Sequence, residues 1–104
     1  MNIYEANYNL KYLNFSVFFE KNEFTKKYTI QTGGRLEKYT EKKILFGLGA
    51  ADSLKNERVQ NESYLEGKII AIDKLTKKHE LVSKGHRNPQ GLLFYEPLNL
   101  VINT

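Results

Sequence analysis

The sequence has no cysteine, no tryptophan and only two prolines. Without cysteine the chain can form neither a disulfide nor a cysteine-ligated zinc or iron–sulfur centre, and it has no thiol nucleophile. Long hydrophobic runs are missing as well, because the longest uncharged one, Ile44–Ala51, is far shorter than the ~20 residues that span a bilayer. The N-terminal residues show no basic start followed by an apolar stretch, so we expect no signal peptide, no membrane partner and a cytoplasmic protein.

What the chain does contain is the composition of one small globular domain. It has 104 residues, of which 40% are hydrophobic and 12% aromatic, and this supplies one modest core. Since domains commonly contain ~100–150 residues, we expect residues 1–104 to form a single domain. The 16 lysines and arginines exceed the 12 acidic residues and give a formal net charge of +4, so the protein is basic.

Period-two alternation predicts β-strands in the first third of the chain. Phe24–Thr32 places aromatic and β-branched residues on alternate positions, which is typical of an amphipathic strand. Leu13–Phe19 alternates in the same way, and the polar residues 21–23 separate the two runs. We therefore expect a β-hairpin over roughly residues 10–32.

The middle and last thirds carry further strand patterns. Ile44–Leu48 is an apolar run that we interpret as a buried strand, and a helix over residues 36–48 is the alternative, because periodicity does not decide short apolar runs. A short helix is expected from Asp52 or Ser53, which can cap its N-terminus, to about Val59. Further strands are predicted at Lys68–Asp73, Lys78–Ser83, Leu92–Glu96 and Leu98–Asn103, with a turn at Asp73–Lys77 and a loop at Gly85–Gly91.

These elements define the predicted fold class. Six or seven short strands and one short helix are typical of a mainly β protein, with an α+β arrangement as the alternative. We expect a small antiparallel barrel or a strongly bent sheet, because closure removes exposed strand edges. In the last strand, Leu98, Leu100 and Ile102 are predicted to face the core, while Asn99 and Asn103 face solvent.

Most aromatic side chains are interpreted as core residues. This prediction covers Phe15, Phe18, Phe19, Phe24, Tyr28 and Phe46. Phe18 breaks the alternation of its strand, so the alternative is that it lies on the outer face in a partner-binding patch. Tyr28, Tyr39 and Tyr95 are candidates for stacking against nucleic-acid bases.

One motif resembles the PD-(D/E)xK nuclease pattern. Asp52 is followed by Glu66-Gly67-Lys68 at the head of an apolar strand. The resemblance implies that the two carboxylates hold Mg²⁺ and that the lysine stabilises charge on the phosphate. It covers three residues, no proline precedes Asp52, and the flanking helices of that fold are not predicted here.

A second motif is similar to RelE-type ribosome-dependent toxins. The run Lys84-Gly85-His86-Arg87 follows a predicted strand, and such toxins use basic and aromatic side chains to stabilise phosphate charge and move protons. The N-terminal helices of that family are not predicted, because residues 10–32 are expected to form a hairpin. We prefer the interpretation of this run as an exposed polar loop.

No metal or other cofactor is predicted. The only two histidines, His79 and His86, lie seven positions apart, and Glu80 adjoins the first. This spacing lacks the helical i, i+4 pattern that would indicate a zinc site. The Gly47-Leu48-Gly49 segment lacks the third glycine of a dinucleotide fingerprint and the Gly-Lys-Ser/Thr of a P-loop.

Charge is distributed unevenly along the chain. Lys68–Arg87 holds six lysines and arginines against two acidic residues, and residues 21–43 are also basic, whereas residues 52–66 are acidic. Basic loops on a β-rich domain can track phosphates or the acidic surface of a partner. The candidate partner- or nucleic-acid-binding residues are Arg35, Lys42, Lys43, Lys74, Lys77, Lys78, His79, Lys84, His86 and Arg87.

The sequence favours a binding protein over an enzyme. We expect a small non-enzymatic protein that binds a larger protein or ribonucleoprotein, and the abundance of lysine, asparagine, isoleucine and tyrosine suggests AT-rich coding from a phage or mobile element. Such a protein would inhibit a host complex such as a CRISPR-type defence nuclease, as anti-CRISPR proteins do. The positive charge argues against mimicry of DNA. The alternative is a direct RNA- or DNA-binding β-barrel, and a third hypothesis is a small metal-dependent nuclease or RelE-like ribonuclease toxin.

Overall fold

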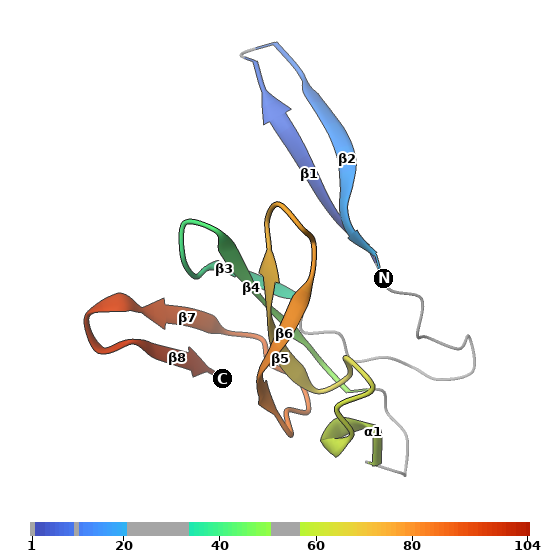
Figure 1. The fold of residues 1–104 in the computed structure, drawn as a ribbon, viewed down its shortest axis with the longest axis vertical. Coiled ribbons are helices and arrows are strands. Elements are labelled where there is room, and N and C mark those ends of the chain that lie inside the picture. Colours follow the sequence, from blue (N-terminus) through green and yellow to red (C-terminus); the bar gives the residue numbers. More distant parts are fainter. Residues whose placement is uncertain (1, 10, 21–33, 51–56) are drawn as a thin grey trace.

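The computed structural model describes residues 2–9, 11–20, 34–50 and 57–104, and in these ranges the chain is mainly β, as predicted (Figure 1). The strands form three antiparallel sheets, which are β1-β2, β3-β4-β5-β6 and β7-β8. No closed barrel is found among the described strands. The elements are β1 (Asn2–Tyr8), β2 (Leu13–Glu20), β3 (Arg35–Lys38), β4 (Lys43–Leu48), α1 (Glu57–Gln60), β5 (Lys68–Asp73), β6 (His79–Lys84), β7 (Leu92–Tyr95), the 3-10 helix η1 (Glu96–Leu98) and β8 (Leu100–Asn103).

The four-stranded sheet is the centre of the molecule, and its two inner strands are buried on both faces. This explains why β4 and β5 read as nearly continuous apolar runs rather than as alternating ones. On one face Leu45, Ile69 and Ala71 pack together. On the other face lie Phe46, Leu48, Ile70 and Ile72. The strands predicted at Ile44–Leu48, Lys68–Asp73 and Lys78–Ser83 are confirmed, within one residue at their ends.

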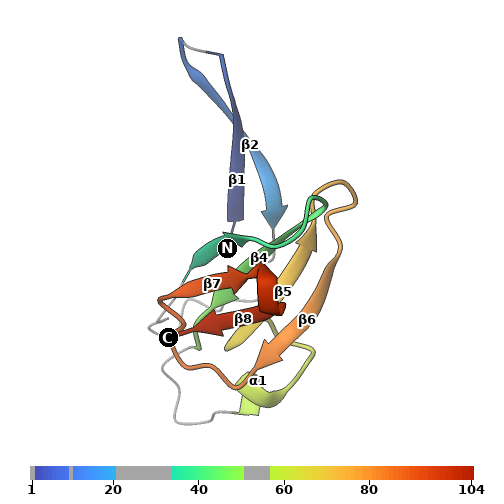
Figure 2. The same cartoon turned by 90° about the vertical axis from the view of Figure 1, so that its left-hand side faces the viewer.

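The β1–β2 hairpin covers the second of these faces with its base only. Ile3, Phe18 and Phe19 are each less than 10% exposed and belong to the same core cluster as Phe46 and Ile70. The rest of the hairpin projects from the body of the molecule, as Figures 1 and 2 both show. This projection contributes to the longest dimension of the molecule, which is 47 Å.

A β-bulge explains how two consecutive phenylalanines face the core. Ile3 pairs with Phe19 while Tyr4 pairs with Val17, so Phe18 is the extra residue of β2. The alternative that Phe18 lies on the outer face is therefore wrong, because its side chain is only 8% exposed. The prediction that Phe15 is a core residue is also wrong, since it lies beyond the base of the hairpin and is 67% exposed.

β2 pairs with β1, a strand that the sequence analysis does not predict. The strand predicted at Leu13–Phe19 is confirmed, and its pairing with β1 is antiparallel. Between the two strands the side chain of Asn9 accepts hydrogen bonds from the backbone N–H groups of Lys11 and Tyr12. The strand predicted at Phe24–Thr32, and with it Phe24 and Tyr28, lies outside the described residues.

The β7–β8 hairpin covers the opposite face of the central sheet, in front of β4 and β5 in Figure 2. Leu92, Phe94 and Val101 pack against the cluster of Leu45, Ile69 and Ala71. The inward orientation predicted for Leu98, Leu100 and Ile102 is wrong, because these side chains are 66%, 46% and 46% exposed. Val101 faces the core instead, and since side chains alternate along a strand its neighbours Leu100 and Ile102 face outward.

The connection from α1 into β5 is closely packed. Gly67 has a φ of +66°, and a Cβ at this position would lie 2.6 Å from the backbone oxygen of His86 and 2.7 Å from the Val59 side chain. Only glycine fits both the conformation and the space. The predicted end of the helix near Val59 agrees with α1, which ends at Gln60, whereas the predicted start at Asp52 or Ser53 lies outside the described residues.

Candidate functional site

The ten basic candidate residues do not form one patch. The central sheet separates them into two groups at its opposite ends, as the strand register shows: Lys43 pairs with Asp73 at one end, and Lys68 pairs with Lys84 at the other. The group at the turns β3–β4 and β5–β6, which we call the turn end, contains Lys42, Lys43, Lys74, Lys77, Lys78 and His79. The group at the far end contains Arg35, Lys84, His86 and Arg87.

The two turns of the turn end are held together by backbone and carboxylate contacts. The backbone N–H of Lys74 donates to the carbonyl of Lys42 at 2.8 Å, which joins one turn to the other. Asp73 accepts the backbone N–H groups of Leu75 and Thr76, each at 2.8 Å. These hydrogen bonds stabilise the carboxylate, so the pKa of Asp73 lies below its ordinary value. The lysines of the turn end therefore lie on two turns whose backbone is held by hydrogen bonds.

Two lysines of the turn end are already engaged. The Nζ atom of Lys43 lies 2.6 Å from Glu80, and this hydrogen bond raises the pKa of Lys43. The Nζ atom of Lys77 lies 3.6 Å from the Glu5 carboxylate and 3.6 Å from the centre of the Phe18 ring. Lys77 therefore links the turn to the base of the β1–β2 hairpin. Lys42, Lys74 and Lys78 are exposed and form no ion pair with another described residue.

His79 also contacts the hairpin. Its ring lies edge-on to Phe19, with the two ring centres 5.7 Å apart and the planes at 84°. Such an edge-to-face pair adds to the packing at the base of the hairpin. The arrangement gives His79 a structural role in addition to its place among the basic candidates.

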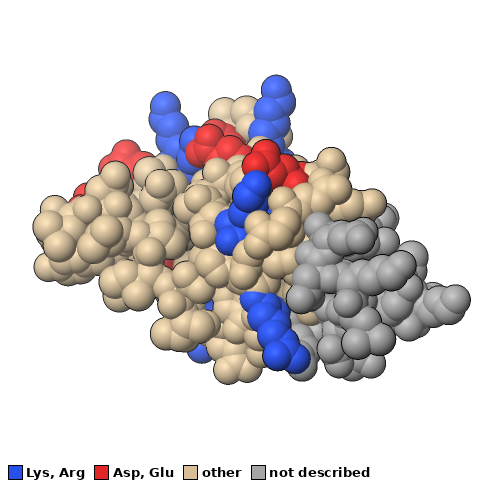
Figure 3. Space-filling view, turned by 90° about the horizontal axis from the view of Figure 1, so that it is seen from below, with Lys and Arg blue, Asp and Glu red and all other residues tan. Residues whose placement is uncertain are grey.

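The far end carries isolated charges. The Arg35 guanidinium donates to the backbone carbonyl of Gln90, and Lys84 pairs with Glu62 at 2.9 Å, which lowers the pKa of Glu62. Arg87 is exposed, and its carbonyl accepts the backbone N–H of Ala50 at 2.7 Å. Figure 3 shows this end of the molecule, where the lysines and arginines stand apart from one another. These positions do not form a continuous phosphate-binding track.

His86 connects the far end to the last strand. One ring nitrogen, Nε2, lies 2.8 Å from the Ser83 hydroxyl, and the other, Nδ1, lies 3.2 Å from the amide nitrogen of Asn103. Burial lowers the pKa of His86, because it disfavours the charged ring. The histidine predicted as a binding residue thus bridges β6 and β8, and the Asn103 side chain, predicted to face solvent, is only partly exposed.

Two of the three residues that carry the nuclease resemblance, Glu66 and Lys68, are buried. Lys68 is 1% exposed, and its ammonium donates to the carbonyls of Val59 at 3.1 Å and Glu66 at 2.8 Å. Glu66 is 2% exposed, and Asp52 lies outside the described residues. In this position Lys68 ties together the backbone around α1 and the start of β5. Within the ranges that the structure describes, no three histidine or acidic side chains are placed to hold a metal ion.

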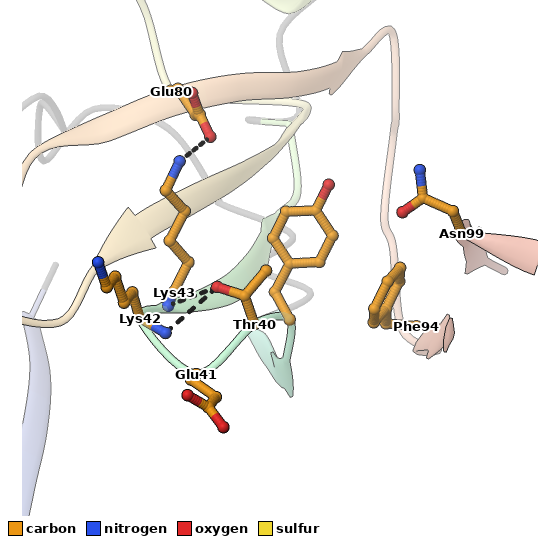
Figure 4. A pocket seen from close by; sticks show the side chains of 8 residues that line it. Thr40, Glu41, Lys42, Lys43, Glu80, Phe94 and Asn99 are labelled. Carbon is orange, nitrogen blue, oxygen red and sulfur yellow. Dashed lines mark hydrogen bonds and ion pairs between the residues drawn. The ribbon is translucent and has the colours of Figure 1, made fainter. Parts of the chain in front are cut away.

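A shallow groove of about 480 Å³ lies beside the β3–β4 turn (Figure 4). Tyr39 and Phe94 form one wall, with their ring centres 4.8 Å apart and the planes at 82°. On the opposite wall, Lys43 pairs with Glu80, and the Thr40 hydroxyl accepts the backbone N–H of Lys43. Tyr39 is partly buried and packs against Phe94, whereas Tyr95, the other described stacking candidate, is 46% exposed.

The most prominent surface feature is one that the sequence-based candidates did not include. In the β1–β2 hairpin, Tyr4 pairs with Val17, Ala6 with Phe15 and Tyr8 with Leu13, so these side chains share one face. We call this set the aromatic face. The exposed fractions are 58% for Tyr4, 71% for Tyr8, 49% for Leu13, 67% for Phe15 and 49% for Val17.

The other face of the same hairpin is different. Beyond the buried pair of Ile3 and Phe19 it carries polar pairs only, which are Glu5 with Ser16 and Asn7 with Asn14. The hairpin therefore presents its apolar side to the surroundings. A signal for β1 exists in the sequence, since apolar Tyr4, Ala6 and Tyr8 alternate with Glu5 and Asn7, but alternation alone assigns the apolar face to the core.

Comparison with known proteins does not place the chain in a family. No protein-family model, no curated protein and no solved structure matches it significantly. Across the described residues, no helix is long and apolar enough to cross a membrane.

Proposed function

We propose that this chain is a non-enzymatic binding protein that attaches to a protein partner through the aromatic face of the β1–β2 hairpin. The observation that carries the proposal is an uninterrupted exposed apolar face on a hairpin that projects from the body. Contiguous exposed apolar surface marks interaction sites, and tyrosine and phenylalanine are enriched in protein interfaces. As the partner we propose a larger host protein or ribonucleoprotein, such as a CRISPR-type defence nuclease, inhibited by a protein of phage or mobile-element origin.

The charge of the hairpin favours a protein partner over nucleic acid. Its described residues include the acidic Glu5 and Glu20 and a single base, Lys11, at the turn. A nucleic-acid strand stacked on the aromatic face would need cationic groups along its phosphates, because phosphate neutralisation supplies most of the affinity. The hairpin does not offer such a row of cations. An apolar surface of a protein is the better match.

The turn end of the central sheet lies at the base of the same hairpin, where Lys77 contacts Glu5 on the polar face, and it supplies charged groups for the rim of an interface. Both turns point toward the side from which the hairpin projects (Figure 1), and they carry the exposed Lys42, Lys74 and Lys78. Interfaces commonly combine an apolar centre with a charged rim, and rim charges steer association and fix orientation. We therefore expect the partner to present an apolar patch beside acidic groups.

The experiment that tests this function compares three forms of the tagged protein in pull-downs from a low-GC bacterial lysate, with and without nuclease treatment. Tyr8→Ser with Phe15→Ser removes two rings from the aromatic face, while Leu75→Ser removes a side chain that is 89% exposed in the β5–β6 turn. We expect one stoichiometric protein that survives nuclease, is retained by Leu75→Ser, and is lost with the double variant. Circular dichroism checks that all three forms are folded.

Two outcomes would contradict the proposal. Recovery of nucleic acid alone, lost on nuclease treatment and weakened by Lys42→Ala and Lys74→Ala, would favour the direct RNA- or DNA-binding alternative. Retention of the same protein partner by the folded double variant would show that the aromatic face is not the binding surface.

A further inference from the structure

A second apolar face lies on the outer side of the β7–β8 hairpin. Leu93 pairs with Ile102 and Tyr95 pairs with Leu100, so these four side chains share one face of the two strands. Each is about half exposed, between 46% and 51%, and Leu98 in the adjoining η1 is 66% exposed. We call these five residues the C-terminal face. Figure 3 shows mostly uncharged surface on the side of the molecule where β7 and β8 lie.

This face is held rigidly. The inner side of the same hairpin, with Leu92, Phe94 and Val101, packs against the core. The chain end is also fixed, because the backbone N–H of Gln90 donates to the carbonyl of Thr104 at 3.0 Å and that of Thr104 donates to Gly91 at 3.1 Å. A face whose supporting side is packed loses little conformational freedom on binding.

We propose that the C-terminal face binds the same face of a second copy and forms a twofold-symmetric dimer. A twofold contact joins the same patch of both copies, so residue i of one copy meets residue j of the other and the reverse, and the patch must complement itself. The C-terminal face, with four aliphatic side chains and one tyrosine, meets this requirement. Two copies that each carry a formal charge of +4 repel one another, and the five residues of the C-terminal face are uncharged and add nothing to this repulsion; the acidic Glu96 adjoins them in the chain.

The size of the face matches a modest dimer. Five side chains exposed to this degree present on the order of 500 Å² per copy. Two copies would then bury roughly 1,000 Å², which is the lower limit for a specific interface and below the ~1,600 Å² of a standard one. We therefore expect a reversible monomer–dimer equilibrium in the micromolar range of protein concentration.

The dimer goes beyond the proposed function and does not depend on it. The aromatic face is on the other hairpin, so each copy keeps it available. A dimer would carry two aromatic faces, and a partner with two matching sites would be bound with an avidity above that of either single contact.

The test is sedimentation of the purified protein over a concentration series, with four chains compared. We expect wild type to shift from monomer to dimer, and Leu93→Lys with Ile102→Lys to remain monomeric, because like charges would face each other across the twofold axis. Leu75→Lys, which adds a charge at an exposed leucine far from the face, should dimerise as wild type does. Phe15→Ser should dimerise as well.

Three results would overturn the dimer: a wild-type monomer at every concentration, a dimer that survives the paired lysines, or a dimer lost with Phe15→Ser but kept in the lysine variant. Leu93→Ser with Ile102→Ser provides a milder variant in case the lysines prevent folding, and it should weaken the dimer at least tenfold. Pull-down of the protein partner by the monomeric variant separates the two proposals, since partner binding does not require the dimer.

Discussion

The two hairpins at the ends of the chain have the same secondary structure but opposite relations to the core. β7–β8 lies along the central sheet, so its inner face is packed over its whole length and its outer face is supported from below. Among the described residues, β1–β2 packs into the core at Ile3, Phe18 and Phe19, and Glu5 contacts Lys77 of the β5–β6 turn, while the part nearer the tip projects. An isolated two-stranded hairpin has marginal stability in water. The comparison shows that one hairpin contributes to the fold along its full length and the other mainly at its base.

The largest effect should come from the base of β1–β2. Phe19→Ala removes a ring that is 7% exposed and packs edge-on against His79, and we expect a loss of about 3–5 kcal/mol in the free energy of unfolding. Phe15→Ala, four residues earlier on the same strand, should cost less than about 0.5 kcal/mol because its ring is exposed. Urea unfolding of both variants measures the difference. Equal losses would mean that the tip is packed as firmly as the base.

A similar contrast is expected within β7–β8. Phe94→Ala removes a partly buried ring beside Tyr39, and we expect a loss of about 2–3 kcal/mol, while Ile102→Ala, whose side chain faces outward, should change stability by less than about 0.5 kcal/mol. Thermal unfolding at low protein concentration, where the monomer prevails, gives both values. A larger loss for Ile102→Ala would restore the inward orientation first predicted for that residue.

Lys77 should set how firmly the projecting hairpin is held. Lys77→Met removes the ion pair with Glu5 and the cation over the Phe18 ring, and we expect faster hydrogen exchange of the backbone amides in β1 and β2. Global stability should fall by no more than about 1 kcal/mol, because both contacts lie near the surface. Lys74→Met, in the same turn, is the control. Equal exchange rates in the two variants would remove Lys77 from this role.

The smallest effect on the free energy of unfolding is expected from His86, whose ring joins β6 to β8. Because the folded pKa of His86 lies below the ordinary value of about 6.5, the unfolded chain binds more protons, and stability falls as pH decreases from about 6.5 through the folded pKa. Protonation also places a ring N–H opposite the amide nitrogen of Asn103. His86→Gln should flatten this part of the stability profile. Glu62 and Asp73, with lowered pKa values, act in a separate window below about pH 4.5.

The central strands could be predicted from the sequence because burial on both faces makes the prediction independent of register. Ile44–Leu48 and Lys68–Asp73 are apolar at nearly every position, so any pairing buries them. The outer hairpins depend on register, and a shift of one residue exchanges their faces. For this reason the sequence pattern places Leu100 and Phe15 in the core, although each lies on the outward face of its strand.

The candidate site was predicted less well, because its residues are brought together by tertiary structure. The basic residues are numerous in the sequence, but Lys42 and Lys84 lie at opposite ends of the central sheet. In addition, Lys43 and Lys77 form ion pairs with neighbouring acidic residues. The aromatic face has a periodic signal in the sequence. What the sequence lacks is the information that the core reaches only as far as Ile3 and Phe19.

The bulge at Phe18 reverses the alternation of side chains between the two faces of strand β2. Toward the tip, Leu13, Phe15 and Val17 point outward, whereas Phe19, of the same odd parity, points inward. Without the extra residue, strict alternation would place Val17 and Phe19 on one side, and a single apolar stripe could not serve both the core and the surroundings. One inserted residue thus divides the stripe into a part that anchors the hairpin in the core and a part that stays exposed.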